Sequence, residues 1–338
     1  MSEERVLVTG GSGFIGAHVI ARLLEQGWAV RTSVRDLAKA DAVRANVRAL
    51  GQDPSPLEFA RADLTRDEGW DEALDGVAYL LHTASPFPSV QPKDESELIV
   101  PAREGTLRVL RAAARAGVER AVVTSSFAAM GYGLPEKVFD ESDWTNVDGA
   151  DVSAYAKSKT LAERAAWDFV AGSDSGLELA TVNPVAVFGP VVDPAHLSSS
   201  ILIVQQLLDG KLPFLPDLNF GVVDVRDVAE LHLLAMVAPE AAGQRFLATA
   251  GPSLSLAEIA AVVQPFRGAG ARSPRRAPDW LVRVLGVINP QVRQFVSQLG
   301  LKKDVSSAKA QSVLGWSPRS AEDAVRASAE SLVALKRS

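Results

Sequence analysis

Two residues that could perform proton transfer, Tyr155 and Lys159, stand four positions apart in the segment YAKSK. On a helix, this spacing places both side chains on one face. A free tyrosine titrates near pH ~10, and an ammonium beside the phenol favours the phenolate and lowers that pKa. Tyr155 would then be an acid that donates a proton near neutral pH. Upstream, an apolar run ends in Ser125 and Ser126, where a serine hydroxyl can hydrogen-bond the oxygen that receives the proton.

A glycine-rich turn lies near the start of the chain, between a short apolar run and an amphipathic segment. Its glycines are spaced G-x-x-G-x-x-G: the first permits a tight turn, the second lets the backbone approach a pyrophosphate, and the third lets a helix pack closely on a sheet. The helix N-terminus offers free N–H groups to phosphates. A bound nicotinamide would place a second positive charge near Tyr155. The pattern predicts a dinucleotide site made by Gly10, Ser12, Gly13, Phe14, Ile15 and Gly16.

The residues after the second predicted strand distinguish the two nicotinamide cofactors. An acidic side chain there binds the ribose 2′-hydroxyl of NAD, whereas an arginine accommodates the 2′-phosphate of NADP. Arg35 occupies this place and Lys39 follows one helical turn later, so the sequence favours NADP, used as NADPH. Asp36 is the residue that would favour NAD if it pointed at the ribose. After the third predicted strand, Asp63 and Leu64 are expected to contact the adenine edge.

Short β-branched runs alternate with longer helix-patterned segments through the first half of the chain. The expected strands are 5–9, 28–34, 57–60, 77–82, 120–125 and 177–183, and the expected helices are 14–26, 37–50, 98–116 and 153–171. This alternation indicates βαβ units, and the continuously apolar strands indicate a sheet covered on both faces. We therefore expect an α/β fold: a doubly wound Rossmann sheet in residues 1–185, with a return segment near 219–237, and a smaller substrate-binding cap, mainly residues 186–338.

Composition excludes several classes of protein. The 338 residues contain no cysteine, which excludes a disulfide, a thiolate nucleophile and Cys-bound zinc. The four histidines (His18, His82, His196 and His232) have no metal-ligand spacing, so no metal site is expected. A net charge of −6 provides no basic field for nucleic acid. Neither a signal peptide nor an apolar run of about 18 residues is found, so we expect a cytoplasmic protein that binds no membrane.

Seven motifs, in this order, resemble those of the extended short-chain dehydrogenase/reductase family. They are VTGGSGFIG (Val8–Gly16), SVRD (Ser33–Asp36), LHTASPF (Leu81–Phe87), VVTSS (Val122–Ser126), YAKSKTLAERAAW (Tyr155–Trp167), NPVAVFGP (Asn183–Pro190) and VVDVRDVAELH (Val222–His232). The likeness covers nearly the whole chain. Within the family, the chain looks most like the branch of dihydroflavonol 4-reductase, cinnamoyl-CoA reductase and microbial NADPH-dependent carbonyl (aldehyde) reductases. The loop between Met130 and Ser153 differs from that of the plant enzymes.

The resemblance implies particular roles for these residues. Ser126, Tyr155 and Lys159 would form the catalytic triad, with Ser125 as the competing serine, and Tyr155 and Lys159 would also contact the cofactor. Further cofactor contacts are implied for Thr83, Ala84, Ser85, Pro184, Val185, Val187 and Ser199.

Together these observations predict an NADPH-dependent oxidoreductase that reduces a ketone or aldehyde to an alcohol, with Tyr155 as the general acid. Its expected partner is a small-molecule carbonyl compound, and Phe87, Phe127 and Met130 either wall the substrate pocket or pack in the core. One alternative is an NAD-dependent nucleotide-sugar epimerase or dehydratase on the same scaffold; another is an NADP-binding redox sensor without turnover. Segments 98–116 and 153–171 would either form a homodimer interface or bury their apolar faces within the monomer.

Overall fold

A seven-stranded sheet forms the centre of the protein. The computed structural model describes residues 4–85, 94–149, 152–195, 197–268, 272–288, 296 and 298–337. The strand order is β11-β6-β5-β4-β1-β2-β3, and every neighbouring pair is parallel. The strands are β1 (Arg5–Thr9), β2 (Ala29–Val34), β3 (Glu58–Arg61), β4 (Val77–His82), β5 (Arg120–Thr124), β6 (Glu178–Pro184) and β11 (Gln244–Ala248). The order reverses between β1 and β4, the place where sheets of this kind bind ligands at the carboxyl ends of their strands.

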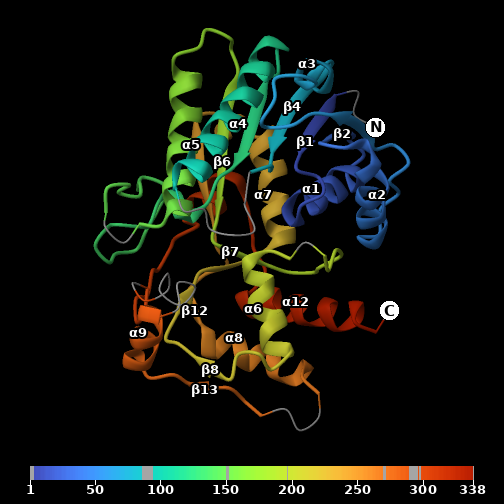
Figure 1. Ribbon diagram of the computed structural model, residues 1–338. Coiled ribbons are helices and arrows are strands. Elements are labelled where there is room, and N and C mark those ends of the chain that lie inside the picture. The colour runs from blue at the N-terminus through green and yellow to red at the C-terminus, as the bar shows by residue number, and fades with distance from the viewer. Residues whose placement is uncertain are drawn as a thin grey trace.

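Helices cover both faces of this sheet (Figure 1). One face carries α1 (Phe14–Glu25), α2 (Ala40–Ala49) and α7 (Val225–Val237); the other carries α3 (Trp70–Leu74), α4 (Ser96–Arg115) and α5 (Ala154–Ala171). Alternate residues of β1 serve the two faces: Val6 and Val8 pack with one cluster and Leu7 with the other, because successive side chains of a strand point to opposite sides. The expected doubly wound Rossmann fold is confirmed.

The expected elements agree with the structure to within one or two residues, with two exceptions. The segment 37–50 divides into a 3₁₀ turn, Leu37–Lys39, and α2, because the Asp36 carboxylate accepts the Ala38 N–H at 3.0 Å and tightens the first turn. The helix α3 was not expected, since five residues are too few to show a helical period. It is held by Trp70, a buried residue whose indole donates to the Asp63 and Arg66 carbonyls.

The cap lies at the bottom of Figure 1 and is built around three helices whose apolar faces meet. Ile201 of α6, Ile259 of α8 and Leu332 of α12 lie in this common core. Short strand pairs complete the cap and join it to the sheet: β7 with β10, β9 with β12, and β8 with β13. The bounds are β7 (Ala186–Phe188), α6 (Ser199–Leu208), β8 (Phe214–Leu215), β9 (Asn219–Phe220), β10 (Val222–Asp224), β12 (Leu254–Ser255), α8 (Leu256–Val263), β13 (Arg275–Arg276), α9 (Asp279–Ile288) and α12 (Ala321–Leu335).

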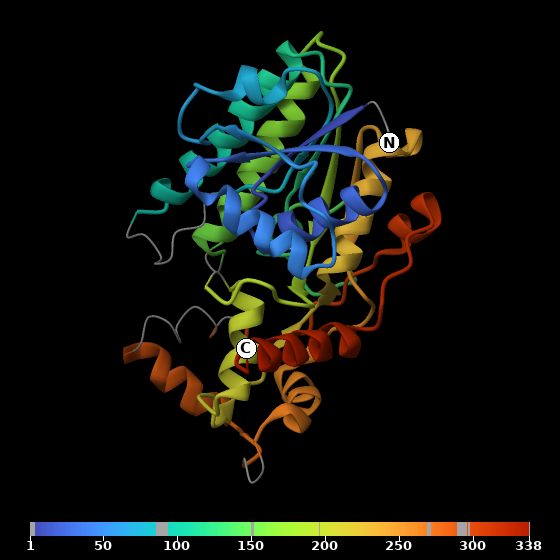
Figure 2. The same cartoon turned by 90° about the vertical axis from the view of Figure 1, so that its right-hand side faces the viewer.

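The chain returns from the cap to the sheet twice, as Figure 2 allows the reader to follow. The return expected near 219–237 extends through β11, which pairs with β6 as far as Ala248. Later, α11 (Ala308–Leu314) packs against α7 and β11. Residues beyond 186 therefore contribute to the nucleotide-binding unit as well as to the cap. None of the described helices is long and apolar enough to cross a membrane.

The helices α4 and α5 pack against each other along their length and against the sheet. Buried residues of α4 include Leu98, Val109 and Leu110, and Lys157 of α5 pairs with Glu95 at 2.9 Å. The apolar faces recognised in the sequence are thus covered within the monomer, and the homodimer stays a prediction.

Three of the four histidines are buried in the folded protein. His18 bonds the Pro190 carbonyl at 2.9 Å, His82 bonds the Thr9 hydroxyl at 2.8 Å, and His232 bonds the Thr124 hydroxyl at 2.6 Å. Burial lowers the pKa of His18 and of His232 to about 4 and that of His82 to about 3. These side chains are therefore neutral at pH 7.

We expect the free energy of unfolding to fall steeply below pH 6.5. An unfolded histidine binds a proton near pH ~6.5, whereas the three buried ones bind it only near their lower pKa values, so the unfolded state takes up more protons as the pH falls. The free energy of unfolding is thus highest above the pKa of the unfolded histidines. Between that pKa and its folded pKa, each histidine lowers the free energy of unfolding by about 1.4 kcal/mol per pH unit. Urea unfolding at neutral and acidic pH, followed by tryptophan fluorescence, measures the slope. A His232→Gln variant should show a shallower slope, and equal slopes would contradict this account.

Candidate active site

The glycine turn packs against the end of β4 so closely that side chains would not fit. Gly10 has a φ of +75°, a conformation that favours glycine, and a Cβ there would lie 2.8 Å from the Ala84 nitrogen. A Cβ on Gly16 would lie 2.2 Å from the Gly10 carbonyl oxygen. Gly11, which the sequence reasoning passed over, is equally confined, because a Cβ would lie 2.3 Å from the Thr32 hydroxyl. Close packing therefore requires glycine at positions 10, 11 and 16 of this turn.

The N-terminus of α1 is open to an anionic ligand. Gly13 is its N-cap, and the N–H groups of the first turn, at Phe14, Ile15 and Gly16, have no partner within a helix. A small pocket at this point is lined by residues of the turn, of α1, of α2 and of the chain that enters the cap: Ser12, Gly13, Phe14, Ala17, Asn46, Val191, Val192, Asp193, Leu197, Ser198 and Ile201. The narrow glycine cradle and the free N–H groups fit the pyrophosphate of a dinucleotide.

The segment after β4 is bonded directly to the end of β1. The Thr83 hydroxyl donates to the Thr9 carbonyl at 2.7 Å, and the Ala84 N–H donates to the Thr9 hydroxyl at 3.2 Å. Ser85 follows and is half-buried. These bonds place Thr83 and Ala84 beside Gly10 and Gly16, at the sheet edge where the sequence implied cofactor contacts. Phe87 and Pro86 lie outside the described residues.

Charged residues surround the end of β2. Arg35 and Lys39 are exposed, whereas the Asp36 carboxylate caps the turn that follows. Asp63 lies within electrostatic reach of Arg35. Its carboxylate accepts the Thr65 N–H and hydroxyl at 2.9 Å each, and these bonds, with Arg35 and Arg66 nearby, lower the pKa of Asp63. Neighbouring Leu64 is half-buried and its carbonyl accepts from Arg108.

Ser126 and Tyr155 come together where β5 ends and α5 begins, and Lys159 lies one helical turn after Tyr155. Ser126 caps a 3₁₀ turn, Phe127–Ala129, by accepting the Ala128 N–H at 3.1 Å. Burial raises the pKa of Tyr155, and a hydrogen bond with Ser126 opposes that rise. Burial has the larger effect, so in the protein without a cofactor the pKa of Tyr155 is raised and not lowered as the sequence predicted. Burial also lowers the pKa of Lys159 to about 8, and the charge of Glu163 opposes the shift.

Ser125 and Ser126 occupy different environments, although they are adjacent in the chain. The Ser125 hydroxyl is buried and donates to the Glu163 carboxylate, whereas Ser126 bonds Tyr155. Ser125 is thus engaged within the protein, and Ser126 is the serine beside the phenol.

Glu163, one helical turn after Lys159, is a buried carboxylate that the sequence reasoning missed. Arg245 of β11 pairs with it at 2.7 Å. Neutral donors satisfy it as well: Ser125, the Asn183 amide at 2.7 Å, the Thr181 hydroxyl at 3.2 Å and the Trp167 indole at 3.3 Å. Its position four residues after Lys159 was the available signal, since that spacing places it on the same helix face.

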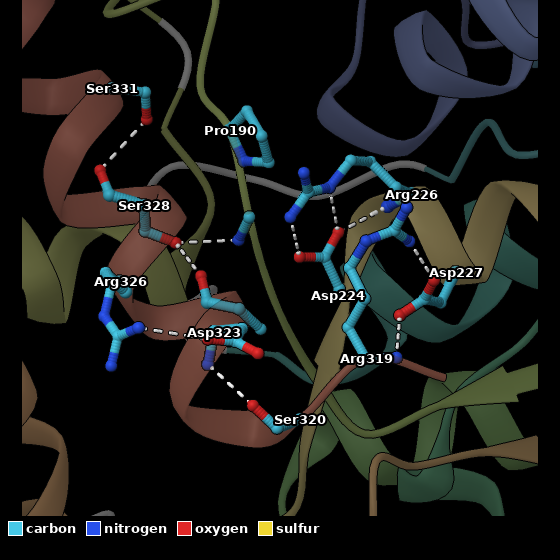
Figure 3. Close-up of polar contacts among 12 residues, drawn as sticks. Pro190, Asp224, Arg226, Asp227, Arg319, Ser320, Asp323, Arg326, Ser328 and Ser331 are labelled. Atoms are coloured by element: carbon cyan, nitrogen blue, oxygen red, sulfur yellow. Dashed lines mark hydrogen bonds and ion pairs between the residues drawn. The ribbon is translucent and has the colours of Figure 1, made fainter. Parts of the chain in front are cut away.

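The loop after β7 is held by helices from both ends of the chain. The Ser328 hydroxyl of α12 accepts the Gly189 N–H at 2.7 Å, and Figure 3 shows Ser328 on the side of α12 that faces Pro190. The Ser331 hydroxyl accepts the Val191 N–H at 2.9 Å. From the other side, His18 of α1 bonds the Pro190 carbonyl. The C-terminal helix therefore positions the loop that borders the glycine turn.

Two ion pairs lie at the start of α7, also drawn in Figure 3. Asp224, which has no exposed surface, forms a two-pronged pair with Arg226 at 2.7 and 2.9 Å. Asp227 bonds both the side chain and the backbone N–H of Arg319, the latter at 2.7 Å. The Asp227–Arg319 pair connects the start of α7 to the segment that leads into α12, whereas the Asp224–Arg226 pair lies within the start of α7.

The remaining predicted contacts lie on β6, β7 and the start of α6. Pro184 is buried, and Val185 and Val187 are half-buried. Ser199 is the first residue of α6, and the hydroxyl of its neighbour Ser200 donates to the Val187 carbonyl. These residues follow the strand beside β5, on the side of the sheet edge that carries Ser126.

The two described candidates for the substrate wall belong to one apolar cluster. Phe127 and Met130 pack with Phe139, Leu247 and Val305. Met130 has no exposed surface and Phe127 retains 9%. Met130 therefore packs in the core, and Phe127 lies at the edge of the cluster.

Comparison with known proteins identifies the family. Residues 6–248 match the NAD dependent epimerase/dehydratase family. The chain belongs to this family, and thus to the extended short-chain dehydrogenases/reductases. Cinnamoyl-CoA reductase CAD2 of Medicago truncatula is 36% identical over 282 residues, which are 77% of this chain and 85% of the relative.

Solved structures support the assignment over the whole length. Yeast methylglyoxal/isovaleraldehyde reductase Gre2, complexed with NADPH, has a TM-score of 0.76 at 26% identity, and the match covers 98% of this chain and 99% of Gre2. UDP-glucose 4-epimerase of Thermotoga maritima has a TM-score of 0.78 at 20% identity, over 98% of this chain and 99% of the epimerase. The likeness to the epimerase shows a shared fold alone.

We expect Gly16→Ala to weaken dinucleotide binding by about tenfold to a hundredfold. The new Cβ overlaps the Gly10 carbonyl, and overpacking of this kind costs about 1–3 kcal/mol. Fluorescence titration with NADPH and with NADH measures the affinity. Gly268→Ala is the matched control, because a Cβ there meets nothing within 4 Å. Equal affinities in the two variants would refute the role of close packing at this turn.

Proposed function

We propose that the protein is an NADPH-dependent reductase that converts a ketone or aldehyde into an alcohol. The observation that carries this proposal is the hydrogen bond between Ser126 and Tyr155, at the sheet edge that also holds the glycine turn. The names of the relatives support it, since cinnamoyl-CoA reductase and methylglyoxal/isovaleraldehyde reductase are both named for carbonyl substrates. The protein is accordingly an NADP-dependent oxidoreductase acting on carbonyl groups.

In this proposal Tyr155 is the general acid. When bound, NADPH supplies a hydride to the carbonyl carbon and becomes NADP⁺. Tyr155 gives its phenolic proton to the carbonyl oxygen, which completes the alcohol. Ser126 donates a hydrogen bond to the same oxygen and stabilises the negative charge that develops there. Lys159 contacts the nicotinamide ribose, and its ammonium favours the phenolate left on Tyr155.

In this proposal the residues that contact the cofactor lie along the carboxyl edge of the sheet. Arg35, with Lys39, receives the 2′-phosphate, since Asp36 is already engaged as a cap. Asp63 and Leu64 border the adenine. The remaining contacts are assigned to Gly10, Ser12, Gly13, Phe14, Ile15, Gly16, Thr83, Ala84, Ser85, Pro184, Val185, Val187 and Ser199.

The alternative functions have less support. A nucleotide-sugar epimerase that retains NAD is expected to carry an acidic residue where Arg35 stands, and the likeness to an epimerase is one of fold. A redox sensor without turnover has no need of the Ser126–Tyr155–Lys159 arrangement. A cytoplasmic location and a homodimer formed through α4 and α5 stay predictions of the sequence.

The two adjacent serines provide a matched test of the catalytic assignment. We expect Ser126→Ala to lower kcat by about 10²–10³, because the developing oxyanion loses a donor. Ser125→Ala should instead lower the melting temperature, since it removes one partner of buried Glu163, with kcat within a few fold of wild type. The decay of NADPH absorbance with a panel of aldehydes, aryl ketones and β-ketoesters measures both. A larger loss of kcat in Ser125→Ala would overturn the assignment, and so would full turnover in Tyr155→Phe.

Arg35 is expected to select the phosphorylated cofactor. Arg35→Ala should reduce kcat/KM for NADPH by about tenfold to a hundredfold and leave that for NADH unchanged, because a charge-assisted bond to phosphate is worth about 1.5–3 kcal/mol. Initial rates with each cofactor at a fixed carbonyl concentration test this. Arg48→Ala, an exposed arginine on α2, is the control. Parallel losses with both cofactors would show that Arg35 does not read the 2′-phosphate.

A further inference from the structure

Lys303 carries a cation that has no counter-charge in the described part of the chain. Its Nζ lies 3.5 Å from the ring centroid of Tyr132, and the residue is half-buried. Neighbouring Lys302 is exposed and pairs with Asp304 at 3.8 Å, but none of the described carboxylates forms an ion pair with Lys303. Burial lowers the pKa of Lys303 to about 8, so the side chain remains mostly an ammonium at pH 7.

The backbone on both sides of Lys303 is held in place. On the side of the cap, the Asn219 amide donates to the Leu301 carbonyl at 3.2 Å. On the other side, the Phe139 N–H donates to the Asp304 carbonyl at 2.9 Å. The backbone that carries the ammonium is therefore held by bonds to both the cap and the nucleotide-binding unit.

Tyr132 connects this cation to the catalytic tyrosine. The rings of Tyr132 and Tyr155 pack against the same buried cluster, which includes Ala128 and Ala156. Burial raises the pKa of Tyr132 to about 12, and the negative charge that Tyr155 can carry adds to the rise, so the two phenols lie within electrostatic reach. Among the residues that the structure describes, none hydrogen-bonds the Tyr132 hydroxyl.

An apolar cluster lies beside these polar groups. Phe127, Phe139 and Val305 belong to one cluster, against which Tyr132 packs, and Phe127 and Tyr132 have ring centroids 6.0 Å apart. A ligand whose carbonyl lay at Tyr155 would therefore meet the half-buried ring of Tyr132 at the edge of this buried cluster, with a cation beyond it.

We propose that Lys303, together with the Tyr132 hydroxyl, binds a carboxylate of the substrate, so that the reductase prefers oxo acids with an apolar portion. This inference rests on the proposed function, because it requires the carbonyl at Tyr155. The face of the Tyr132 ring engages only one side of the ammonium, which has three N–H donors. A carboxylate accepts from such donors through short, charge-assisted bonds and supplies the missing counter-charge.

The test compares acids with their neutral esters on the full-length enzyme with NADPH. Suitable pairs are 2-oxo-4-phenylbutanoate and 4-oxo-4-phenylbutanoate, each with its methyl ester. For at least one pair we expect wild type to favour the acid in kcat/KM by about tenfold or more, since a bond to a charged group is worth about 1.5–3 kcal/mol. Lys303→Gln should abolish that ratio through a higher KM for the acid, and Lys303→Arg should restore most of it.

Lys302→Gln is the matched control, because Lys302 is the exposed neighbour with the same side chain. Its acid-to-ester ratio should equal that of wild type. The wild-type ratio should also decline as the pH rises through about 8, where Lys303 loses its charge. Calorimetric titration of the corresponding hydroxy acid into the NADP⁺-loaded protein gives a readout without turnover and should show about tenfold weaker binding in Lys303→Gln.

The outcomes separate this inference from the function on which it rests. Equal rates with acid and ester in wild type, or equal ratios in Lys303→Gln and Lys302→Gln, overturn the carboxylate site while carbonyl reduction stands. Absence of NADPH oxidation with every acid, ester, ketone and aldehyde overturns the proposed function and this inference with it. Thermal melting of each variant identifies any that fails to fold, and Lys303→Arg then decides the case.

Discussion

The arrangement of the catalytic elements depends on satisfying one buried carboxylate, that of Glu163. An ionised carboxylate without partners is costly in a protein interior, and breaking a buried pair by removing one partner costs about 3–5 kcal/mol. Here the pair with Arg245 and the hydrogen bonds from Ser125, Thr181 and Asn183 supply the compensation. Those partners lie directly after β5, on β6 and on β11, so the bonds to one buried carboxylate attach α5 to three neighbouring strands of the sheet.

The same network extends to the proposed substrate side of the site. Arg245 donates to the carbonyls of Glu141 and Asp143, at 2.8 and 2.7 Å, and lies 3.7 Å from the Trp144 ring centroid. Those residues belong to the loop that also contains Tyr132. The helix that bears Lys159 and the loop that borders the proposed carboxylate site are thus anchored to one ion pair.

The cap and the nucleotide-binding unit share a joint formed by residues from distant parts of the chain. Hydroxyls of α12 hold the loop around Pro190, which α1 contacts through His18, and the Asp227–Arg319 pair connects α7 to the segment before α12. The cap therefore contacts the nucleotide-binding unit through several segments that are far apart in the chain. Through the bond from Ser331 to Val191, α12 helps to hold a loop that lines the pocket at the N-terminus of α1.

Local pattern alone was enough to predict the Rossmann sheet, most element bounds, the glycine turn and the position of Tyr155 and Lys159 one turn apart on a helix. Each depends on neighbours in the chain: the apolar period of a strand or helix, the spacing of glycines, or two residues one helical turn apart. The family assignment rests on the same local motifs. Helix α3 was not predicted because its five residues are too few to show a helical period of apolar residues.

The features that the sequence left undecided depend on contacts between residues that are far apart in the chain. Ser125 and Ser126 are chemically identical neighbours, and only the packing of α5 on β5 gives Glu163 to one and Tyr155 to the other. The pKa of Tyr155 followed burial, which no spacing of charged residues reveals. The return of the chain through Ala248 and the approach of Lys303 to Tyr132 likewise depend on tertiary packing. A sequence pattern records which side of an element is apolar, but it contains no information on which other element covers that side.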